Sequence, residues 1–566
     1  MKKHFGTFIC LYFVLAVLLA PRAFAAEIID SGYCGGEGDG TNLTWTLDSE
    51  GTLTISGEGA MADWDFKQAV PWYIYPSPVK KVVVSNMVTN IGRAAFSGCD
   101  ALTQINIPDG VTSIGLCAFS NCDSLTQITL PDCVASIGEA AFEGCASLTQ
   151  INIPDNVTTI GESAFRGCAS LAQINIPNSV TSIGEAAFSS CSSLAEVTVD
   201  DYNAFYEDVF GVLYNKEHST LYCYPAGNQS DTFIIPDSVS TIGAGAFSGC
   251  SFLTQITIPN SVTAIGSSAF SDCDSLTQIT IPNSVTSISS SAFFDCDSLS
   301  QITIPDSVTS IAYHAFSGCS ALAQIAIPDS VTFIGNGAFS WCTSLVQISI
   351  PDGVASIADN TFQDCALLTQ ITLPDSITSI GNASFYGCTS LPRIIIPKGV
   401  TYIDAGAFAY CSSLKQVVFN GDAPRDCEMA FSNVAATVYY PADNPTWTED
   451  KLQDYDGDLA WMPYTEDMIY HTRFSVDTIL QDEFDLEITV ARLGDSTNDV
   501  AMISLYSPEG KYLETILWQL TDDAVQTYTL SRDNTDGKIG QIKVFVLDGL
   551  ANPVPLAEGA EIASDT

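Results

Sequence analysis

The sequence predicts a solenoid of stacked β coils, in which each repeat packs only on its neighbours along the chain. Three features of the 566-residue sequence predict this fold. A cysteine recurs every 23 residues, a Leu-x-x-Ile-x-Ile-Pro run follows it, and an Ala-Phe pair comes later in the same interval. Self-similarity at a fixed period of roughly 20–50 residues is typical of a repeat architecture.

The repeats form two blocks separated by an interruption at residues 199–235. The interruption is rich in aromatic residues, and its LYNKEHSTLY segment places polar turn residues between two strand-like runs, so we expect an inserted β-hairpin. The marker cysteines are Cys99, Cys122, Cys145, Cys168 and Cys191 in the first block, and Cys250, Cys273, Cys296, Cys319, Cys342, Cys365, Cys388 and Cys411 in the second.

Within a repeat, the Leu-x-x-Ile-x-Ile segment predicts a short strand because its apolar residues alternate and are mostly β-branched. The proline that follows cannot donate to a ladder and ends the strand. A Val-x-x-Ile segment brings a second apolar edge inward, and the Ala-Phe pair fills the interior. Burying about six apolar residues contributes about 10–15 kcal/mol, less than ordering one repeat costs at about 1–2 kcal/mol per residue. One repeat therefore cannot fold alone, and stacking is required.

The cysteines are expected to be reduced packing residues. Thirteen of the nineteen cysteines belong to the repeat. An odd number of cysteines in identical environments cannot all pair with one another in disulfides. A small buried cysteine acts as a compact hydrophobic residue whose S–H can reach a neighbouring carbonyl. Occasional disulfides and metal binding are the alternatives.

The repeat over residues 80–420 resembles the BspA-like leucine-rich repeats of bacterial cell-surface and secreted proteins. The resemblance implies a leucine-rich-repeat solenoid of parallel β strands, mostly β with short helical or irregular segments. Some members of that family are adhesins that bind host extracellular-matrix proteins such as fibronectin and fibrinogen. It therefore implies recognition without naming a ligand for this chain.

The two ends of the chain carry different patterns. Residues 1–25 have basic residues, a short apolar run and an Ala-x-Ala motif, which predicts a secretory signal peptide. The apolar run is shorter than the roughly 20 residues of a membrane span, and the C-terminus shows neither an apolar tail nor a sorting signal. We therefore expect an extracellular protein, secreted or associated with the cell surface, with no membrane span in the mature chain.

Three further segments complete the domain prediction. Residues 26–80 predict a β-hairpin N-terminal cap, which shields the first coil of the solenoid. The solenoid follows at 81–464, with a degenerate last coil and C-terminal cap at about 420–464. Residues 465–566 show regularly spaced strands and turns such as SPEG, which predict a β-sandwich-like domain.

Charge and motif content exclude several functions. The chain has 65 acidic and 20 basic residues, a net charge of −45, so we expect no nucleic-acid partner. The sequence has no H-E-x-x-H, Walker or G-x-S-x-G motif, and His218, His314 and His471 lie in different regions. We predict a non-enzymatic protein with no catalytic residues, no cofactor and no metal site.

Acidic residues leave one question open. Asp454, Asp456 and Asp458 in a DYDGD segment are spaced like calcium ligands but lack the other ligands of a calcium loop, so an acidic turn is the first interpretation. A row of aspartates after the prolines, such as Asp306 and Asp329, either caps turns or shares cations.

The candidate binding surface is the outward side of the predicted strands. A row of glutamines with neighbouring hydroxyl residues could bind a glycan or an extended peptide, or could simply form hydrogen bonds along the ladder. Late repeats break this pattern with basic and aromatic residues, which are enriched in interface anchors. The candidate binding residues are Gln278, Thr280, Gln301, Gln324, Gln347 and Gln370 in the polar rows, and Trp341, Tyr386, Arg393, Tyr402, Tyr410 and Lys415 at the breaks.

The sequence thus favours a recognition protein that binds an extracellular protein or glycan through the solenoid. One alternative is a cell-envelope spacer attached through residues 465–566, and another is an enzyme with its site in that last segment. The oligomeric state is not predicted.

Overall fold

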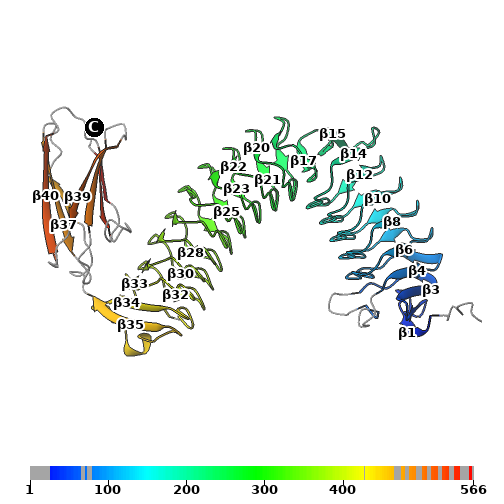
Figure 1. Cartoon of the computed structure of the whole chain (residues 1–566), viewed down its shortest axis with the longest axis horizontal. Coiled ribbons are helices and arrows are strands. Elements are labelled where there is room, and N and C mark those ends of the chain that lie inside the picture. Colours follow the sequence, from blue (N-terminus) through cyan, green and yellow to red (C-terminus); the bar gives the residue numbers. More distant parts are fainter. Residues whose placement is uncertain are drawn as a thin grey trace, which may run out of the picture. The chain divides into compact units, whose positions relative to one another are not determined.

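The computed structural model describes residues 26–64, 70–72, 79–425 and 427–464, and the backbone of seven strands between residues 473 and 563. The predicted signal peptide lies outside the described residues. The chain divides into two units, Met1–Gln229 with Gly243–Cys250, and Ser230–Ile242 with Ser251–Thr566. Each unit contains stacked coils of short strands joined by turns (Figure 1).

The first unit begins with three antiparallel strands, β1 (Ile28–Tyr33), β2 (Leu43–Asp48) and β3 (Thr52–Ala60). The predicted hairpin is confirmed as β2 and β3, whose turn is held by the Asp48 carboxylate, which accepts the N–H groups of Glu50 and Thr52. Strand β3 also pairs in parallel with β4 (Lys81–Val84), the first strand of the repeats.

The regular coils of the first unit each carry a strand from the Leu-x-x-Ile-x-Ile segment and a shorter second strand. The first kind comprises β4, β6 (Gln104–Asn106), β8 (Gln127–Thr129), β10 (Gln150–Asn152), β12 (Gln173–Ile176) and β14 (Glu196–Val199). The second kind comprises β5 (Met87–Asn90), β7 (Ser113–Ile114), β9 (Ser136–Ile137), β11 (Thr159–Ile160) and β13 (Ser182–Ile183).

The interruption forms a meander of three antiparallel strands, β15 (Tyr206–Val209), β16 (Val212–Asn215) and β17 (Thr220–Cys223). The predicted hairpin in this segment is therefore confirmed as β16 and β17, and β15 adds a third strand.

The second unit repeats the same pattern. Strands on the Leu-x-x-Ile-x-Ile side are β18 (Thr232–Ile234), β20 (Gln255–Thr257), β22 (Gln278–Thr280), β24 (Gln301–Thr303), β27 (Gln347–Ser349), β29 (Gln370–Thr372), β31 (Arg393–Ile396) and β33 (Gln416–Phe419). Second strands are β19 (Thr241–Ile242), β21 (Ala264–Ile265), β23 (Ser287–Ile288), β25 (Ser310–Ile311), β26 (Phe333–Ile334), β28 (Ser356–Ile357), β30 (Ser379–Ile380) and β32 (Tyr402–Ile403). Longer strands β34 (Ala435–Pro441) and β35 (Asp458–Tyr464) continue the β31–β33 sheet in parallel and close the described solenoid.

The last seven strands form two antiparallel sheets. Their orders are β36-β37-β40 and β39-β38-β41-β42. The strands are β36 (Arg473–Asp477), β37 (Glu483–Ala491), β38 (Val500–Tyr506), β39 (Tyr512–Gln519), β40 (Val525–Asp533), β41 (Gln541–Leu547) and β42 (Ala560–Ala563). A β-sandwich-like domain over residues 465–566 stays a prediction.

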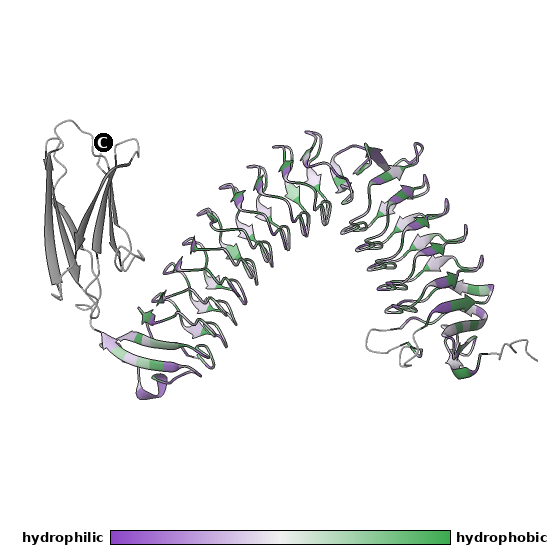
Figure 2. Ribbon diagram, in the orientation of Figure 1, coloured by the Kyte–Doolittle hydropathy of each residue, from purple (hydrophilic) through white to green (hydrophobic). Residues whose placement is uncertain are grey.

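A stack of phenylalanine rings fills the centre of the coils. Each Ala-Phe pair places its ring inside the coil, and rings on successive coils lie parallel, with centroids 5.3 Å apart for Phe119 and Phe142 and 5.5 Å apart for Phe316 and Phe339. These side chains are fully buried. Hydrophobic and hydrophilic residues alternate along the strands, which directs one set inward and the other outward (Figure 2).

The marker cysteines form a second ladder beside the phenylalanines. The Sγ atom of Cys319 donates to the backbone carbonyl of Phe293 on the preceding coil at 3.1 Å, and Cys342 donates to Phe316 at the same distance. None of the eighteen described cysteines forms a disulfide. Burial raises the pKa of the Cys342 thiol to about 12, so the thiol stays neutral.

The short helical or irregular segments expected between the strands are mostly turns. In the described residues the only helix is one 3₁₀ turn, η1 (Glu449–Lys451). The reason lies in the hydrogen bonds at the Ala-Phe turns. The backbone N–H of Phe316 donates to the carbonyl of Ala338 on the next coil at 2.8 Å, so it is not available for a helical bond within its own coil.

Candidate binding face

The predicted glutamine row is formed by strict register between coils. Strands β22 and β24 pair in parallel with Gln278 opposite Gln301, and β27 and β29 pair with Gln347 opposite Gln370. The 23-residue period places like residues beside each other, and the isoleucine between the outward residues points into the core. Gln278, Gln301, Gln324 and Gln347 are exposed, and Gln370 is half-buried.

One of the interruptions of the strand ladder in the second unit lies between β24 and β27. Residues 324–326 form no strand, and only a single bridge joins Gln324 to Gln347. One sheet ends at β24 and the next begins at β27. In this fully described stretch, no backbone hydrogen bond joins residues 300–304 to residues 323–327. The second strands remain paired behind this opening, since β25 and β26 are in register.

Two alanines mark the open coil. Most coils carry a hydroxyl residue before the glutamine, and its side chain donates to the preceding coil, as Ser300 Oγ does to the Thr277 carbonyl at 3.2 Å. Ala323 holds this position in the open coil and has no hydroxyl. Ala326 replaces the Thr, Asn or Ser found two residues after the glutamine on most other coils. Alanine is also a poorer strand residue than threonine.

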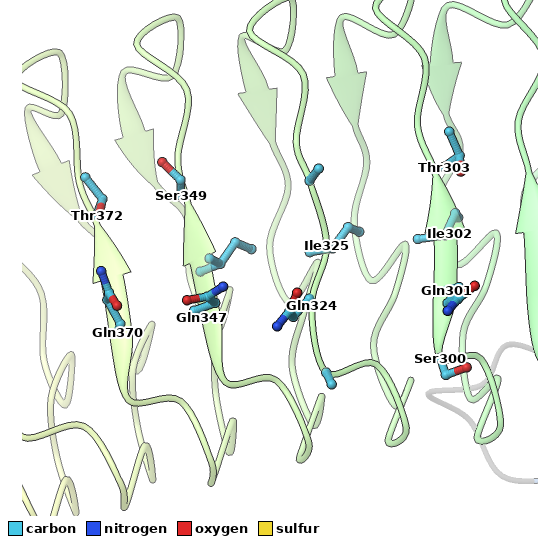
Figure 3. A pocket seen from close by; sticks show the side chains of 13 residues that line it. Ser300, Gln301, Ile302, Thr303, Gln324, Ile325, Gln347, Ser349, Gln370 and Thr372 are labelled. Carbon is cyan, nitrogen blue, oxygen red and sulfur yellow. The ribbon is translucent and has the colours of Figure 1, made fainter. Parts of the chain in front are cut away.

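A groove of about 790 Å³ lies over this opening. Figure 3 shows its four glutamines side by side on neighbouring coils, with Thr303, Ser349 and Thr372 further along the same coils. The lining contains no charged and no aromatic side chain. The glutamines that line it are Gln301, Gln324, Gln347 and Gln370.

Four of the predicted binding residues therefore lie in one groove, while Gln278 and Thr280 continue the same polar face on β22 outside it. The sequence analysis did not single out Ala323 and Ala326, which line the groove at the opening. The signal was present, because two outward hydroxyl positions change to alanine within one repeat.

The predicted basic residues lie together near the end of the strand face. Arg393 on β31 pairs in register with Gln416 on β33, and Lys415 directly precedes Gln416. Lys415 is exposed, and its Nζ donates to the Ala435 carbonyl at 3.4 Å, whereas Arg393 is half-buried.

The predicted aromatic residues lie elsewhere on the coils. Tyr386 and Tyr410 contact each other in the turns after the Ala-Phe pairs, with ring centroids 5.1 Å apart. Trp341 occupies the same repeat position as Tyr410, directly before a marker cysteine, and both have a φ of 60°. Tyr402 lies on the second strand β32. The six residues at the breaks therefore occupy different sides of the coils.

The acidic segments form turns and local contacts. The Asp456 carboxylate accepts a hydrogen bond from Ser432 Oγ at 2.7 Å, and the Gly457 N–H donates to the Asp454 carbonyl. In the row after the prolines, Asp375 forms an ion pair with Lys398 at 2.7 Å. Across the described residues, no group of three or more side chains is arranged to hold a metal ion.

One acidic cluster was not predicted. Asp272, Asp274, Asp295 and Asp297 lie in the turns of two adjacent coils. Partial burial, followed by the charges of Asp297 and Asp272, raises the pKa of Asp274. The four carboxylates lie on the turn edge of these coils, and none of them lines the groove.

The remaining predicted features concern histidines and membranes. His218 lies in the interruption with Nε2 3.0 Å from the Glu207 carboxylate. His471 lies outside the described residues. Within the part of the chain that the structure describes, no helix is long and apolar enough to cross a bilayer.

The parallel strands, the 23-residue register and the phenylalanine stack define a leucine-rich-repeat solenoid. The chain belongs to the family described as BspA type leucine rich repeat region, whose model matches in six copies over residues 73–211, 221–346 and 309–437. A fold of this kind is typically a binding scaffold, and the family fits a binding role.

Solved structures with similar folds come from bacteria. A leucine-rich repeat protein from Eubacterium ventriosum is 29% identical, with 68% of this chain and 96% of that chain covered and a TM-score of 0.49. A leucine rich cell surface protein from Faecalibacterium prausnitzii is 29% identical, with 61% and 95% covered and a TM-score of 0.42. One from Bacteroides ovatus is 25% identical, with 78% and 100% covered and a TM-score of 0.34. No curated protein gives a significant match.

Proposed function

We propose that the mature chain is a non-enzymatic extracellular recognition protein that binds an extracellular protein or glycan through the strand face of its solenoid. The observation that carries this proposal is the uncharged groove at the opening of the strand ladder. Amide and hydroxyl groups that line a concave surface can orient a ligand, and the apolar residues beside them can exclude water.

The proposed location is the cell surface or the extracellular medium. Residues 1–25 have the pattern of a secretory signal peptide. A net charge of −45 opposes binding to nucleic acid and to anionic membranes, so an adhesion or capture role with a protein or glycan partner fits better.

A cell-envelope spacer is the second candidate function. The observation that favours it is the regularity of the core, in which phenylalanine rings and cysteine thiols repeat from coil to coil. In this case residues 465–566 would attach the chain to the envelope, and the length of the solenoid would set how far the chain extends from it.

If the groove is the binding site, binding of the mature chain to immobilised extracellular-matrix proteins and neutral glycans can be measured and should depend on the groove. We expect the chain to retain at least one of them, and Ala326→Arg to weaken that interaction at least about tenfold, a loss of about 1.4 kcal/mol. The added side chain fills the groove from an exposed position. Surface plasmon resonance measures the change.

Thr257→Arg is the matched control, because Thr257 occupies the same outward repeat position on a regular coil. This variant should bind as the parent does. Retention on cell-wall material by the parent and both variants alike, with no binding to matrix proteins or glycans, would support the spacer and contradict the recognition proposal.

A further inference from the structure

We propose that the groove binds an extended, uncharged polypeptide segment in the polyproline II conformation, which runs across the coils along the glutamine row. This inference rests on the proposed function and specifies its ligand class. The row is formed by Gln301, Gln324, Gln347 and Gln370.

Main-chain groups at the opening need the partners that a polypeptide carries. On regular coils the carbonyl before the strand accepts a backbone N–H from the next coil, as Thr277 O does from the Ser300 N–H at 3.0 Å and Val346 O does from the Thr369 N–H at 2.9 Å. In the described residues around the groove, no such bond reaches Ser300 O from Ala323. Ser300 lines the groove, so this carbonyl can accept a hydrogen bond from a ligand.

The glutamine amides complement a polypeptide backbone that has no internal hydrogen bonds. Each primary amide offers two N–H donors and a carbonyl acceptor. A polyproline II chain leaves all its carbonyls open to such donors. Four amides in one row therefore supply donors along the length of the ligand, while Ile325 and Ala326 provide apolar contact.

The spacing of the coils agrees with this conformation. Neighbouring paired strands lie about 4.7–4.9 Å apart, so the two paired spacings from Gln324 through Gln347 to Gln370 span about 9.4–9.8 Å. One turn of polyproline II contains three residues and rises about 9.3 Å. The same side of the ligand thus meets a glutamine on every second coil. A ligand in the β conformation repeats every two residues, about 6.6–6.8 Å, so its repeat does not match the spacing of the glutamines. The three glutamines on the paired coils, Gln324, Gln347 and Gln370, therefore match one turn of the ligand.

The lining argues against two other ligand classes. It has no aromatic side chain on which a sugar ring could stack and no cation for a phosphate or sulfate. The nearby turns carry Asp295 and Asp297, which oppose an anionic ligand. An uncharged peptide needs neither an aromatic surface for stacking nor a cation for its charge.

The test uses the mature chain and a fluorescein-labelled peptide of alternating proline and alanine, which favours polyproline II and keeps backbone N–H donors. The peptide is long enough to span the four glutamines, and binding is followed by fluorescence anisotropy. We expect saturable binding that Ala326→Arg weakens at least about tenfold and that Thr257→Arg leaves unchanged. Ala323→Thr restores a hydroxyl that can reach Ser300 O, so it should also weaken binding by narrowing the opening. Circular dichroism of each variant checks that the solenoid is folded.

Two comparison probes separate the possible failures. A flexible Gly-Ser peptide of equal length should bind more weakly, and equal binding by both peptides would overturn the polyproline II assignment. If a neutral oligosaccharide binds in an Ala326-dependent manner and the proline-alanine peptide does not, the ligand class is wrong while the proposed function stands. If no probe or matrix partner depends on Ala326, both the inference and the proposed function fail.

Discussion

Replacement of Phe316 by alanine is expected to lower the free energy of unfolding by about 3–5 kcal/mol. Phe316 is fully buried, and its ring lies 5.5 Å from Phe293 on one side and 5.5 Å from Phe339 on the other. The substitution leaves a cavity between two coils that are held by their hydrogen-bonded turns, so the neighbours can collapse only partly. Urea unfolding of the mature chain, followed by circular dichroism, measures the loss.

Phe252→Ala is the matched control for this change. Phe252 is 46% exposed in a turn between two coils, and its loss should change the free energy of unfolding by no more than about 0.5 kcal/mol. Equal losses for the two variants would show that the phenylalanine stack is not the stabilising core of the solenoid.

The native mature chain is expected to react with a thiol reagent at Cys133 and to protect its other thiols. Cys133 is half-buried, whereas the other seventeen described cysteines are buried. Burial raises the pKa of the Cys191 and Cys342 thiols from 9.0 to about 12, which lowers the fraction of reactive thiolate about a thousandfold at neutral pH. Titration with Ellman's reagent should show one fast thiol.

Unfolding in urea should release all eighteen thiols of the mature chain, and Cys133→Ser should remove the fast one. A native chain that reacts quickly at several positions, or that shows fewer than eighteen thiols after unfolding without a reductant, contradicts the buried reduced ladder.

The solenoid could be predicted from the sequence because its period fixes the register. Once Cys319 and Phe316 are recognised as repeat positions, their neighbours 23 residues away must stack on them. The exposed glutamines follow from the same argument, since they alternate with buried isoleucines. The interruption could be predicted as a hairpin from its turn residues, although β15 could not, because YEDV lacks a regular alternation of apolar residues.

The position of the groove could not be predicted from the polar rows alone. Alanine before the glutamine does not by itself open the ladder, because Ala172 and Ala195 hold the same position on coils whose strands β12 and β14 pair in register. The loss of backbone pairing depends on how two whole coils pack. The aromatic candidates do not line the groove. Trp341 and Tyr410 lie in turns, and Tyr402 lies on the second strand β32. Knowing which repeat contains a residue does not show on which side of the coil that residue lies.

Amide hydrogen exchange of the mature chain, alone and with the partner it retains, tests most directly the claim that the ladder opening is the binding site. We predict slower exchange on binding at residues 300–304 and 323–327, where the backbones of neighbouring coils are not hydrogen-bonded to each other. Regular strands such as β20 should exchange at the same rate with and without the partner, because their ladders are already formed. Slower exchange confined to residues 465–566, or to any surface other than the groove, would contradict the account.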